Sequence, residues 1–415
     1  MFVSVCAVLV VAGAVLRPLP VRPSPAPPPP PRALSHRPAW AAPDARSATP
    51  PRRRVARVRT IASWPLPPRA HATALATAPD GAVAMSVWPL GAGYLLVVDA
   101  LGDRLVVLDA RGRVRQQWLG MRGPEATVST PIGALPQSDG TIWVQNAGHG
   151  RIAIFRMSSD TLAFQRLLRA GPKPVGFREG WAVAPGEQVV FLAQPQATWF
   201  ASDPTPGVAA LPMPDLVRVD RTGRELSRTR LAPPEGELVV FSHKTPVAGG
   251  ERTSLLTQPF SPAPLSAVGP SGQMAVAFSA SYRIRWHQSE DAAVTLEHPT
   301  ATRVPLTGRE RDSVEAIIAS WARRQGLERH LVPFSAPTHK PLLRRLSFDR
   351  DGRLWVERDG PDGVLFDVYR PAQRAPERIA SPAGVTLLPE TAQGDTLFAV
   401  ERKGATRWVL RVVTR

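Results

Sequence analysis

The segment Arg104–Gly120, RLVVLDARGRVRQQWLG, decides the fold of this chain. An apolar run, Leu-Val-Val-Leu, leads into the turn residues Asp-Ala-Arg-Gly, and a second run ends in Trp118-Leu-Gly. Runs of this length bounded by turns that contain Gly and Asp are typical of antiparallel strands. Similar patterns begin again at Leu216 and at Tyr282, so the segment predicts a sheet unit that is repeated along the chain.

The repeated unit can be followed six times from about residue 55 onward. The units lie at intervals of about 40–80 residues, which matches four-stranded propeller blades that carry insertions. One such sheet is apolar on both faces, whereas a ring of sheets buries every face. The pattern therefore predicts an all-β fold, a six-bladed β-propeller of four-stranded blades over residues 54–415. The strands that define it are 94–100, 104–110 and 113–120; 141–147, 151–157 and 162–168; 188–194, 215–221 and 225–231; 273–280, 282–288 and 293–299; 353–360 and 363–370; and 395–402 and 407–414.

The last unit stops after its third strand, at 407–414. The segment 54–63, RVARVRTIAS, alternates as a half-buried strand does and precedes the first unit. An uncovered strand edge is a liability in a folded protein. We therefore expect 54–63 to pair with 407–414 as the outer strand of the last blade and so to close the ring.

One helix interrupts the strands. Thr307-Gly-Arg-Glu310 has the form of a capping box, in which the two side chains satisfy free backbone N–H groups, and Gly326 can end a helix. We expect a helix near 308–325 that packs on the rim or face of the propeller; a partner-binding helix is the alternative. Its apolar positions have helical spacing and are Val314, Ile317, Ile318 and Trp321.

The first 53 residues differ from the rest in composition. Residues 2–16 are apolar without a break and fit the core of a secretion signal, while 17–53 is rich in Pro and Arg. We expect a signal peptide in 1–16, with an uncleaved anchor as the second reading and a misplaced start codon as the third, followed by a disordered linker. The protein is then exported to the periplasm, the cell surface or the medium. Cys6 is the single cysteine, which excludes an internal disulfide.

Three stretches carry a resemblance to a known family: Asp99–Gly112 (DALGDRLVVLDARG), Asp139–Phe155 (from DGTIWVQN to RIAIF) and Phe348–Val356 (FDRDGRLWV). They are similar to the NHL-like six-bladed β-propellers, and within them to the exported bacterial group called only "6-bladed β-propeller". The resemblance covers about residues 55–415. It implies the fold but no particular activity, because this architecture carries many functions.

Composition narrows the classes of ligand. The net charge of +17 reflects either an arginine-rich codon bias or an anionic partner. No pair among the eight histidines has helical metal-ligand spacing, and no Cys-x-x-Cys occurs, so we expect no metal and no other cofactor. No interleaving of aromatic and basic residues indicates nucleic acid. Membrane contact is expected only through an uncleaved N-terminal segment.

The best local candidate for a binding site is 145–151, QNAGHGR, which joins the second and third strands of its unit. In propellers such connections open onto the face that holds the mouth of the central channel. The alternative is a solvated, glycine-rich turn. With the matching loops of other units, the candidate ligand-binding residues are Asp99, Asp103, Asn146, His149, Arg151, Arg358 and Asp359. This mixture of acids and bases differs from the acid-rich ring of a calcium site.

The sequence contains no assembled catalytic motif. We therefore expect a monomeric, non-enzymatic binding propeller of the cell envelope or exterior, with a protein, peptide or glycan at the channel mouth. The alternative is a propeller enzyme with lactonase-like or lyase-like activity that uses a channel-bound metal.

Overall fold

The computed structural model of the protein describes residues 56, 58–66, 85–90, 93–100, 102–120, 128, 131–137, 139–146, 151–158, 160–168, 181–184, 188–193, 215–230, 240–247, 250–288, 292–298, 300–371, 373–403 and 406–414. The expected signal or anchor at 1–16 and the expected linker at 17–53 lie outside these residues.

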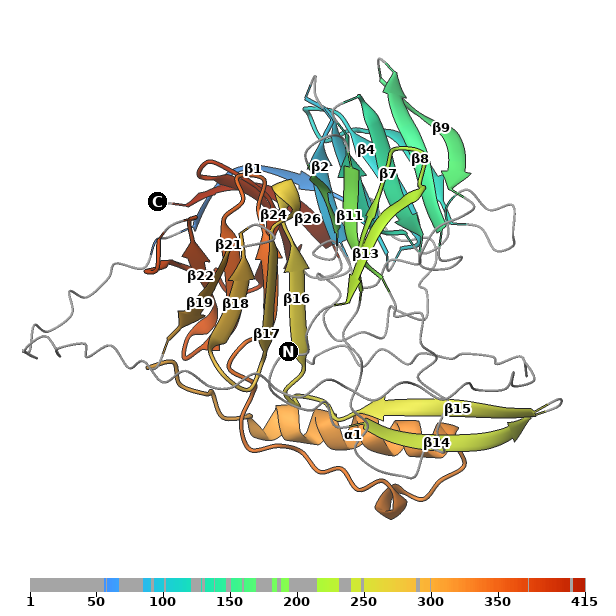
Figure 1. Ribbon diagram of the computed structural model, residues 1–415, viewed down its shortest axis with the longest axis vertical. Coiled ribbons are helices and arrows are strands. Elements are labelled where there is room, and N and C mark those ends of the chain that lie inside the picture. Colours follow the sequence, from blue (N-terminus) through green and yellow to red (C-terminus); the bar gives the residue numbers. More distant parts are fainter. Residues whose placement is uncertain are drawn as a thin grey trace, which may run out of the picture.

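Among the described residues, six four-stranded antiparallel sheets form a ring (Figure 1), which confirms the six-bladed propeller. The first strands of neighbouring blades contact one another all the way round. Blades 1 to 3 are β2 (Met85–Pro89), β3 (Leu95–Asp99), β4 (Arg104–Leu108) and β5 (Val114–Leu119); β6 (Pro131–Pro136), β7 (Thr141–Asn146), β8 (Arg151–Ser158) and β9 (Thr161–Leu168); and β10 (Trp181–Ala184), β11 (Gln188–Ala193), β12 (Asp215–Val219) and β13 (Glu225–Arg230). Blades 4 to 6 are β16 (Pro264–Val268), β17 (Met274–Phe278), β18 (Arg283–His287) and β19 (Ala293–Glu297); β20 (Arg345–Phe348), β21 (Leu354–Gly360), β22 (Gly363–Tyr369) and β23 (Glu377–Ala380); and β24 (Val385–Gln393), β25 (Thr396–Lys403), β26 (Thr406–Thr414) and β1 (Val58–Pro65).

Blade 6 joins the two ends of the propeller. Strand β1 pairs antiparallel with β26, from Val58 opposite Thr414 to Pro65 opposite Trp408, with one irregularity between Thr60 and Ala62. The expected closure of the ring by the N-terminal strand is thereby confirmed.

Each junction between neighbouring blades within the described part of the chain contains a cluster of buried apolar side chains. At the junction of blades 4 and 5, the rings of Trp286 and Phe348 lie 5.9 Å apart between centroids. Burial of apolar side chains at every junction is the main force that favours the closed ring.

A turn of the form Asp-x-x-Gly-Arg occurs in blades 1, 3 and 5, beginning at Asp109, Asp220 and Asp349. One carboxylate oxygen of each Asp accepts the backbone N–H groups two and four residues later, and the other accepts the Nε–H of the Arg. The glycines have φ between +75° and +89°, a region that favours glycine. In blades 1 and 3 the turn joins the third and fourth strands, so it accounts for the likeness between the opening segment and the one that begins at Leu216.

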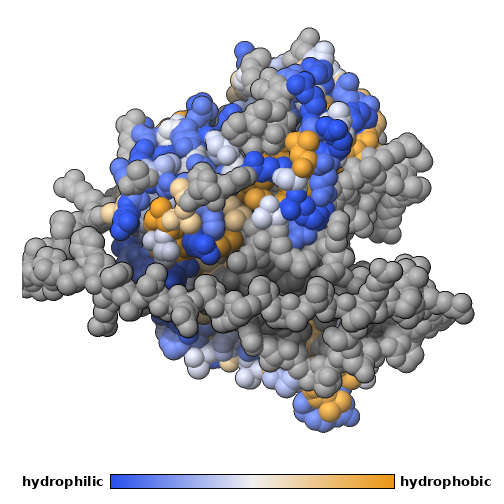
Figure 2. Space-filling view, viewed as in Figure 1, coloured by the Kyte–Doolittle hydropathy of each residue, from blue (hydrophilic) through white to orange (hydrophobic). Residues whose placement is uncertain are grey.

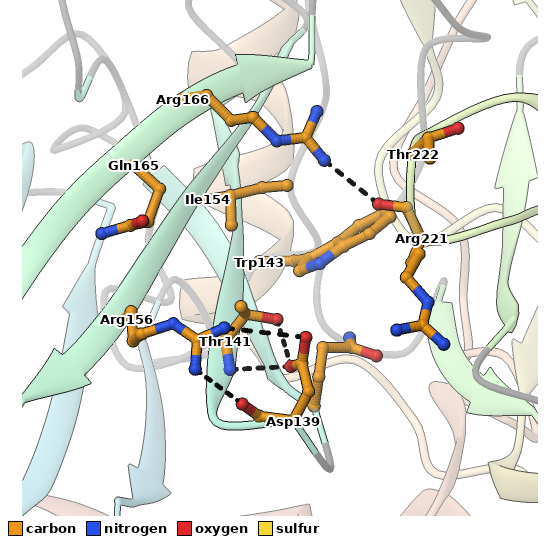
Figure 3. A pocket seen from close by; sticks show the side chains of 10 residues that line it. Asp139, Thr141, Trp143, Ile154, Arg156, Gln165, Arg166, Arg221 and Thr222 are labelled. Atoms are coloured by element: carbon orange, nitrogen blue, oxygen red, sulfur yellow. Dashed lines mark hydrogen bonds and ion pairs between the residues drawn. The ribbon is translucent and has the colours of Figure 1, made fainter.

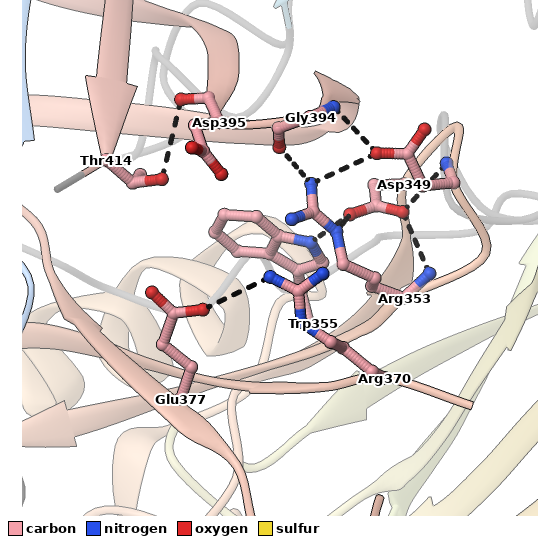
Figure 4. Close-up of polar contacts among 9 residues, drawn as sticks. Asp349, Arg353, Trp355, Arg370, Glu377, Gly394, Asp395 and Thr414 are labelled. Carbon is pink, nitrogen blue, oxygen red and sulfur yellow. Dashed lines mark hydrogen bonds and ion pairs between the residues drawn. The ribbon is translucent and has the colours of Figure 1, made fainter. Parts of the chain in front are cut away.

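The turn of blade 5 also joins two blades (Figure 4). The carboxylate of Asp349 accepts the Nε1–H of Trp355 at 2.7 Å, and Arg353 Nη2 donates to the carbonyl of Gly394 in blade 6 at 2.5 Å. The backbone N–H of Gly394 in turn donates to Asp351. This turn therefore both closes a hairpin and fixes the next blade.

The expected helix is present as α1 (Gly308–Arg324), with Thr307 and Glu310 forming the capping box and Gly326 at φ +71° after its end. Its apolar face packs against a hairpin that the sequence analysis did not predict. The hairpin consists of β14 (Val240–Val247) and β15 (Gly250–Thr257). Together α1, β14 and β15, here named the cap, enclose Phe241, Leu256, Phe260, Leu306, Val314, Ile318, Trp321, Ala322, Val332 and Phe334.

Both insertions of the cap occur in connections between blades, β14–β15 between blades 3 and 4 and α1 between blades 4 and 5. In a four-stranded meander these connections lie on the same face as the turns between second and third strands. We name this the capped face, and the opposite side, with the remaining turns, the open face. In Figure 1 the hairpin and α1 lie side by side below the blades.

The described surface is mainly hydrophilic in Figure 2, with separate small apolar patches.

Short 3-10 helices occur at η3 (Pro270–Gly272) and η4 (Arg329–Leu331). No helix within the described ranges is both long and apolar enough to span a bilayer.

Candidate functional site

The predicted site residue Asp99 is fully buried at the end of β3. Its carboxylate lies 3.1 Å from Nε of Arg104 and 3.3 Å from Nη1 of Arg407, which belongs to β26. It also accepts the backbone N–H of Gly102 at 3.0 Å. Because Arg407 comes from blade 6, Asp99 connects the first and last blades, and this placement favours a structural role over ligand binding.

Asp103, in the same turn, is half-buried and has a φ of +49°. Its carbonyl accepts the backbone N–H of Gly120 at 2.6 Å. A Cβ at Gly120 would lie 2.0 Å from the Asp103 carboxylate, so a larger residue there would require the Asp103 side chain to move. Asp103 therefore packs against the end of β5.

The turn 145–151 is described only in part. Asn146 is fully buried at the end of β7, opposite Pro131 and Arg151 in the sheet register. His149 lies outside the described residues, and for Arg151 only the backbone is described. Ligand binding by these residues stays a prediction.

Arg358, at the end of β21, belongs to a buried polar cluster between blades 4 and 5. Its Nε lies 2.7 Å from Oδ2 of the fully buried Asp367, whose other oxygen lies 3.1 Å from Nε of Arg378. Burial would raise the pKa of Asp367, but the hydrogen bonds and charges of the two arginines outweigh it and lower the pKa below its usual range. The hydroxyl of Tyr282 also donates to Asp367, at 3.0 Å, and lies 3.1 Å from that of Tyr369.

The surroundings of this cluster also shift the pKa values of its two tyrosines and its histidine. Burial, followed by the charge of Asp367, raises the pKa of Tyr282 far above its ordinary value, and burial raises that of Tyr369 to about 12. Burial also lowers the pKa of His298, which lies 3.1 Å from Arg378. Both tyrosines are therefore protonated at neutral pH, and the shift of the His298 pKa favours its neutral form.

Asp359 connects blade 5 to the cap. Nζ of Lys340 lies 2.7 Å from Oε1 of Glu310 at the start of α1 and 3.6 Å from Oδ1 of Asp359. Nη1 of Arg344 lies 3.7 Å from the same oxygen of Asp359. Burial would raise the pKa of Glu310, but hydrogen bonds from Lys340 and Thr307 lower it overall. The carboxylate of Asp359 is therefore part of the joint that holds the cap to the ring.

These placements bring Asp99, Arg358 and Asp359 to the capped face as members of internal ion pairs, and ligand binding by them stays a prediction. Within the ranges that the structure describes, no group of three His, Cys, Asp or Glu residues could hold a metal ion.

A cavity of about 340 Å³ lies on the open face between blades 2 and 3 (Figure 3). The sequence analysis did not identify it, because its walls come from two blades and from residues as far as 85 positions apart in the chain. The only signal in the sequence was the abundance of arginine around polar turns. The described residues that line it are Gln137, Asp139, Thr141, Trp143, Ile154, Arg156, Gln165, Arg166, Arg221 and Thr222.

Strands β7 and β8 supply the apolar wall of the cavity, Trp143 and Ile154, which are 2 % and 4 % exposed. The turn before β7 supplies Asp139, which accepts the backbone N–H and the hydroxyl of Thr141 at 2.9 and 2.6 Å. Burial would raise the pKa of Asp139, but these two hydrogen bonds, aided by the charges of Arg156 and Arg221, lower it overall. The cavity thus combines an apolar wall with an ionised carboxylate and three arginines.

No family model matches the chain, and no curated protein is significantly similar to it. Solved structures are similar at low identity. A member of the DUF4221 family from Bacteroides vulgatus is 10 % identical with a TM-score of 0.47, and 86 % of this chain and 98 % of that chain are covered. Virginiamycin B lyase from Staphylococcus aureus is 10 % identical with a TM-score of 0.37, covering 85 % and 99 %. A gluconolactonase from Xanthomonas campestris is 14 % identical with a TM-score of 0.35, covering 85 % and 98 %. At these values the assignment of the fold rests on the sheet topology, and the chain is a six-bladed β-propeller.

Proposed function

We propose that this protein is a non-catalytic binding propeller of the cell envelope or exterior, which receives a protein, peptide or glycan at its capped face. One observation carries this proposal: three of the predicted site residues on that face are engaged in ion pairs within the protein. Asp99 pairs with Arg407, Arg358 with Asp367, and Asp359 with Lys340. Catalysis needs accessible acids, bases or nucleophiles, whereas a binding face needs a rigid frame, and internal pairing favours the latter.

The proposal includes three narrower points. The chain is assigned to the NHL-like propellers, and to their exported bacterial group, on the motifs at Asp99–Gly112, Asp139–Phe155 and Phe348–Val356. Export is inferred from the apolar run 2–16 followed by a Pro-rich segment. The protein acts as a monomer, because the closed ring leaves no uncovered strand edge at β26.

The proposal is tested with the full chain by thermal melting against a panel of oligosaccharides, peptides, lactones and esters, with mass spectrometry of each compound afterwards. We expect at least one oligosaccharide or peptide to raise Tm in a saturable way and to be recovered unchanged. Asp359→Asn, which weakens the joint of the cap, should reduce that shift. Asp160→Asn, at an exposed turn of the open face, is the matched control and should not. Turnover of a lactone or ester that is lost in Asp359→Asn would overturn the proposal in favour of an enzyme.

A further inference from the structure

The polar cluster between blades 4 and 5 contains more positive than negative charge. The guanidinium groups of Arg358 and Arg378 share the single carboxylate of Asp367. Among the described residues, no second acidic group pairs with either arginine. The cluster therefore keeps an excess of one positive charge while Asp367 is ionised. A charge without a counterion is costly at a site that is largely removed from water.

The other members of the cluster do not change this excess. The hydroxyl of Tyr282 donates to Asp367, so it carries its proton. Nη2 of Arg378 lies 3.1 Å from Nε2 of His298, and because a guanidinium can only donate hydrogen bonds, Nε2 is the acceptor and bears no proton. Nδ1 of the same ring lies 3.2 Å from the hydroxyl oxygen of Thr300, which can accept its N–H. His298 is therefore neutral.

Arg358 is nine-tenths buried, yet only its Nε is hydrogen-bonded. This nitrogen donates to Oδ2 of Asp367 at 2.7 Å, and within the described part of the chain neither η nitrogen of Arg358 has a partner. Neither η nitrogen is sealed from water, since the side chain keeps 10 % of its surface exposed and that of the neighbouring Arg378 keeps 30 %. A small solute can therefore reach these N–H groups from outside.

We propose that the outer edge of this arginine pair is a subsite for one carboxylate group, which accepts hydrogen bonds from the η N–H groups of Arg358 and Arg378. A carboxylate supplies one negative charge, equal to the excess, and its two oxygens match the forked donors of a guanidinium. Asp367 holds Nε of both side chains, so the arginines are oriented before the ligand arrives. The subsite does not depend on the function proposed above, because it concerns the junction of two blades and not the mouth of the channel.

Isothermal titration of the full-length protein at low ionic strength tests the subsite with two matched pairs of probes. Glucuronate and glucose differ by a carboxylate on a sugar, whereas N-acetylglycine and N-acetylglycinamide differ by a carboxylate on a peptide unit. We expect saturable binding of at least one carboxylate, at least about tenfold weaker binding of its neutral partner, and weaker binding as salt is raised. The two pairs distinguish an acidic sugar from a peptide terminus. Absence of saturable binding by both carboxylates up to tens of millimolar, or equal binding of the neutral partner, would overturn the proposal.

Variants locate the carboxylate at the arginine pair. Arg378→Gln removes the excess charge and leaves Asp367 paired with Arg358, so the variant should fold and bind the carboxylate at least about tenfold more weakly. Arg370→Gln is the matched control, because Arg370 lies in the same blade, pairs with Glu377 at the surface and is not part of the cluster. It should leave the affinity unchanged.

Arg358→Lys is the second variant, needed if Arg378→Gln melts early. It keeps a positive charge beside Asp367 but removes the η N–H groups, and it should also weaken binding about tenfold. Unchanged affinity in a folded form of either variant would show that the carboxylate binds elsewhere and would overturn the assignment.

Discussion

At the scale of single residues, aspartate has two distinct roles in this propeller. In the turns at Asp109 and Asp220 it organises a hairpin at the surface, whereas Asp367 is buried among arginines between two blades. The turn role could be predicted from the sequence, because Asp, Gly and Arg stand close together in it. The buried role could not, because Asp367 meets Tyr282 only after blades 4 and 5 have come together.

The turn role predicts a dependence of stability on pH. A hydrogen bond from the Thr222 hydroxyl at 2.6 Å, with others from the turn, lowers the pKa of Asp220 to about 2. The unfolded value is about 3.9. Since the folded pKa is the lower one, the carboxylate stabilises the fold above about pH 4, and this contribution is lost as the pH falls toward 2. Asp220→Asn should therefore melt below the wild type at pH 7 and together with it near pH 2. Circular dichroism melts across this range measure the difference, with Asp160→Asn as control, and a difference that does not change with pH would contradict the prediction.

At the scale of elements, α1 shows how a local signal and a distant partner combine. The capping box at Thr307 and Glu310 predicted where the helix begins. The pattern did not reveal that Trp321 would pack edge-to-face on Phe241 of β14, at 5.7 Å between ring centroids. The hairpin contains Pro246, which is atypical of a strand, and its sequence does not repeat the blade pattern. It was therefore missed.

Removal of the capping box should loosen the cap and leave the ring intact. In Thr307→Ala the backbone N–H of Glu310 loses its acceptor, which costs about 1 kcal/mol of local stability. Hydrogen exchange should become faster in α1 and in β14–β15, which share one apolar core, and stay unchanged in blades 1 and 2. Thr302→Ala, an exposed position before the helix, is the control. Equal acceleration throughout the chain would mean that cap and ring unfold as one unit.

At the scale of the whole molecule, the pairing of β1 with β26 decides whether the ring is closed. Deletion of residues 1–53 leaves this pairing in place, whereas deletion of 1–66 removes β1 and uncovers the edge of β26. We expect the first truncation to melt like the full chain and the second to lose several kcal/mol, on the scale of about 25 cal/mol per Å² of apolar surface exposed, and to associate through the free edge. Melting curves and size exclusion of both chains test this, and identical behaviour would contradict the role of β1.

The ring as a whole was the most predictable feature, because its information is repeated. Six units with similar spacing indicate six blades even where one unit, such as 188–231, is stretched. For the candidate site, the sequence predicted only the face of the propeller on which its residues lie, and not their contacts. The pairing of Asp359 with Lys340 and the cavity beside Trp143 both depend on side chains that different blades or insertions bring together. No periodicity along the chain encodes such contacts.

Closure by β1 also sets the order of events during biosynthesis. Val58 leaves the ribosome early, yet its partner Thr414 is made roughly 350 residues later, which at ~5–20 residues per second is a delay on the order of 20–70 s. During that time blades can form one after another, but the ring must stay open and its first strand must remain unpaired. The ring can therefore close only after β26 has been synthesised and lies on the same side of any membrane as β1.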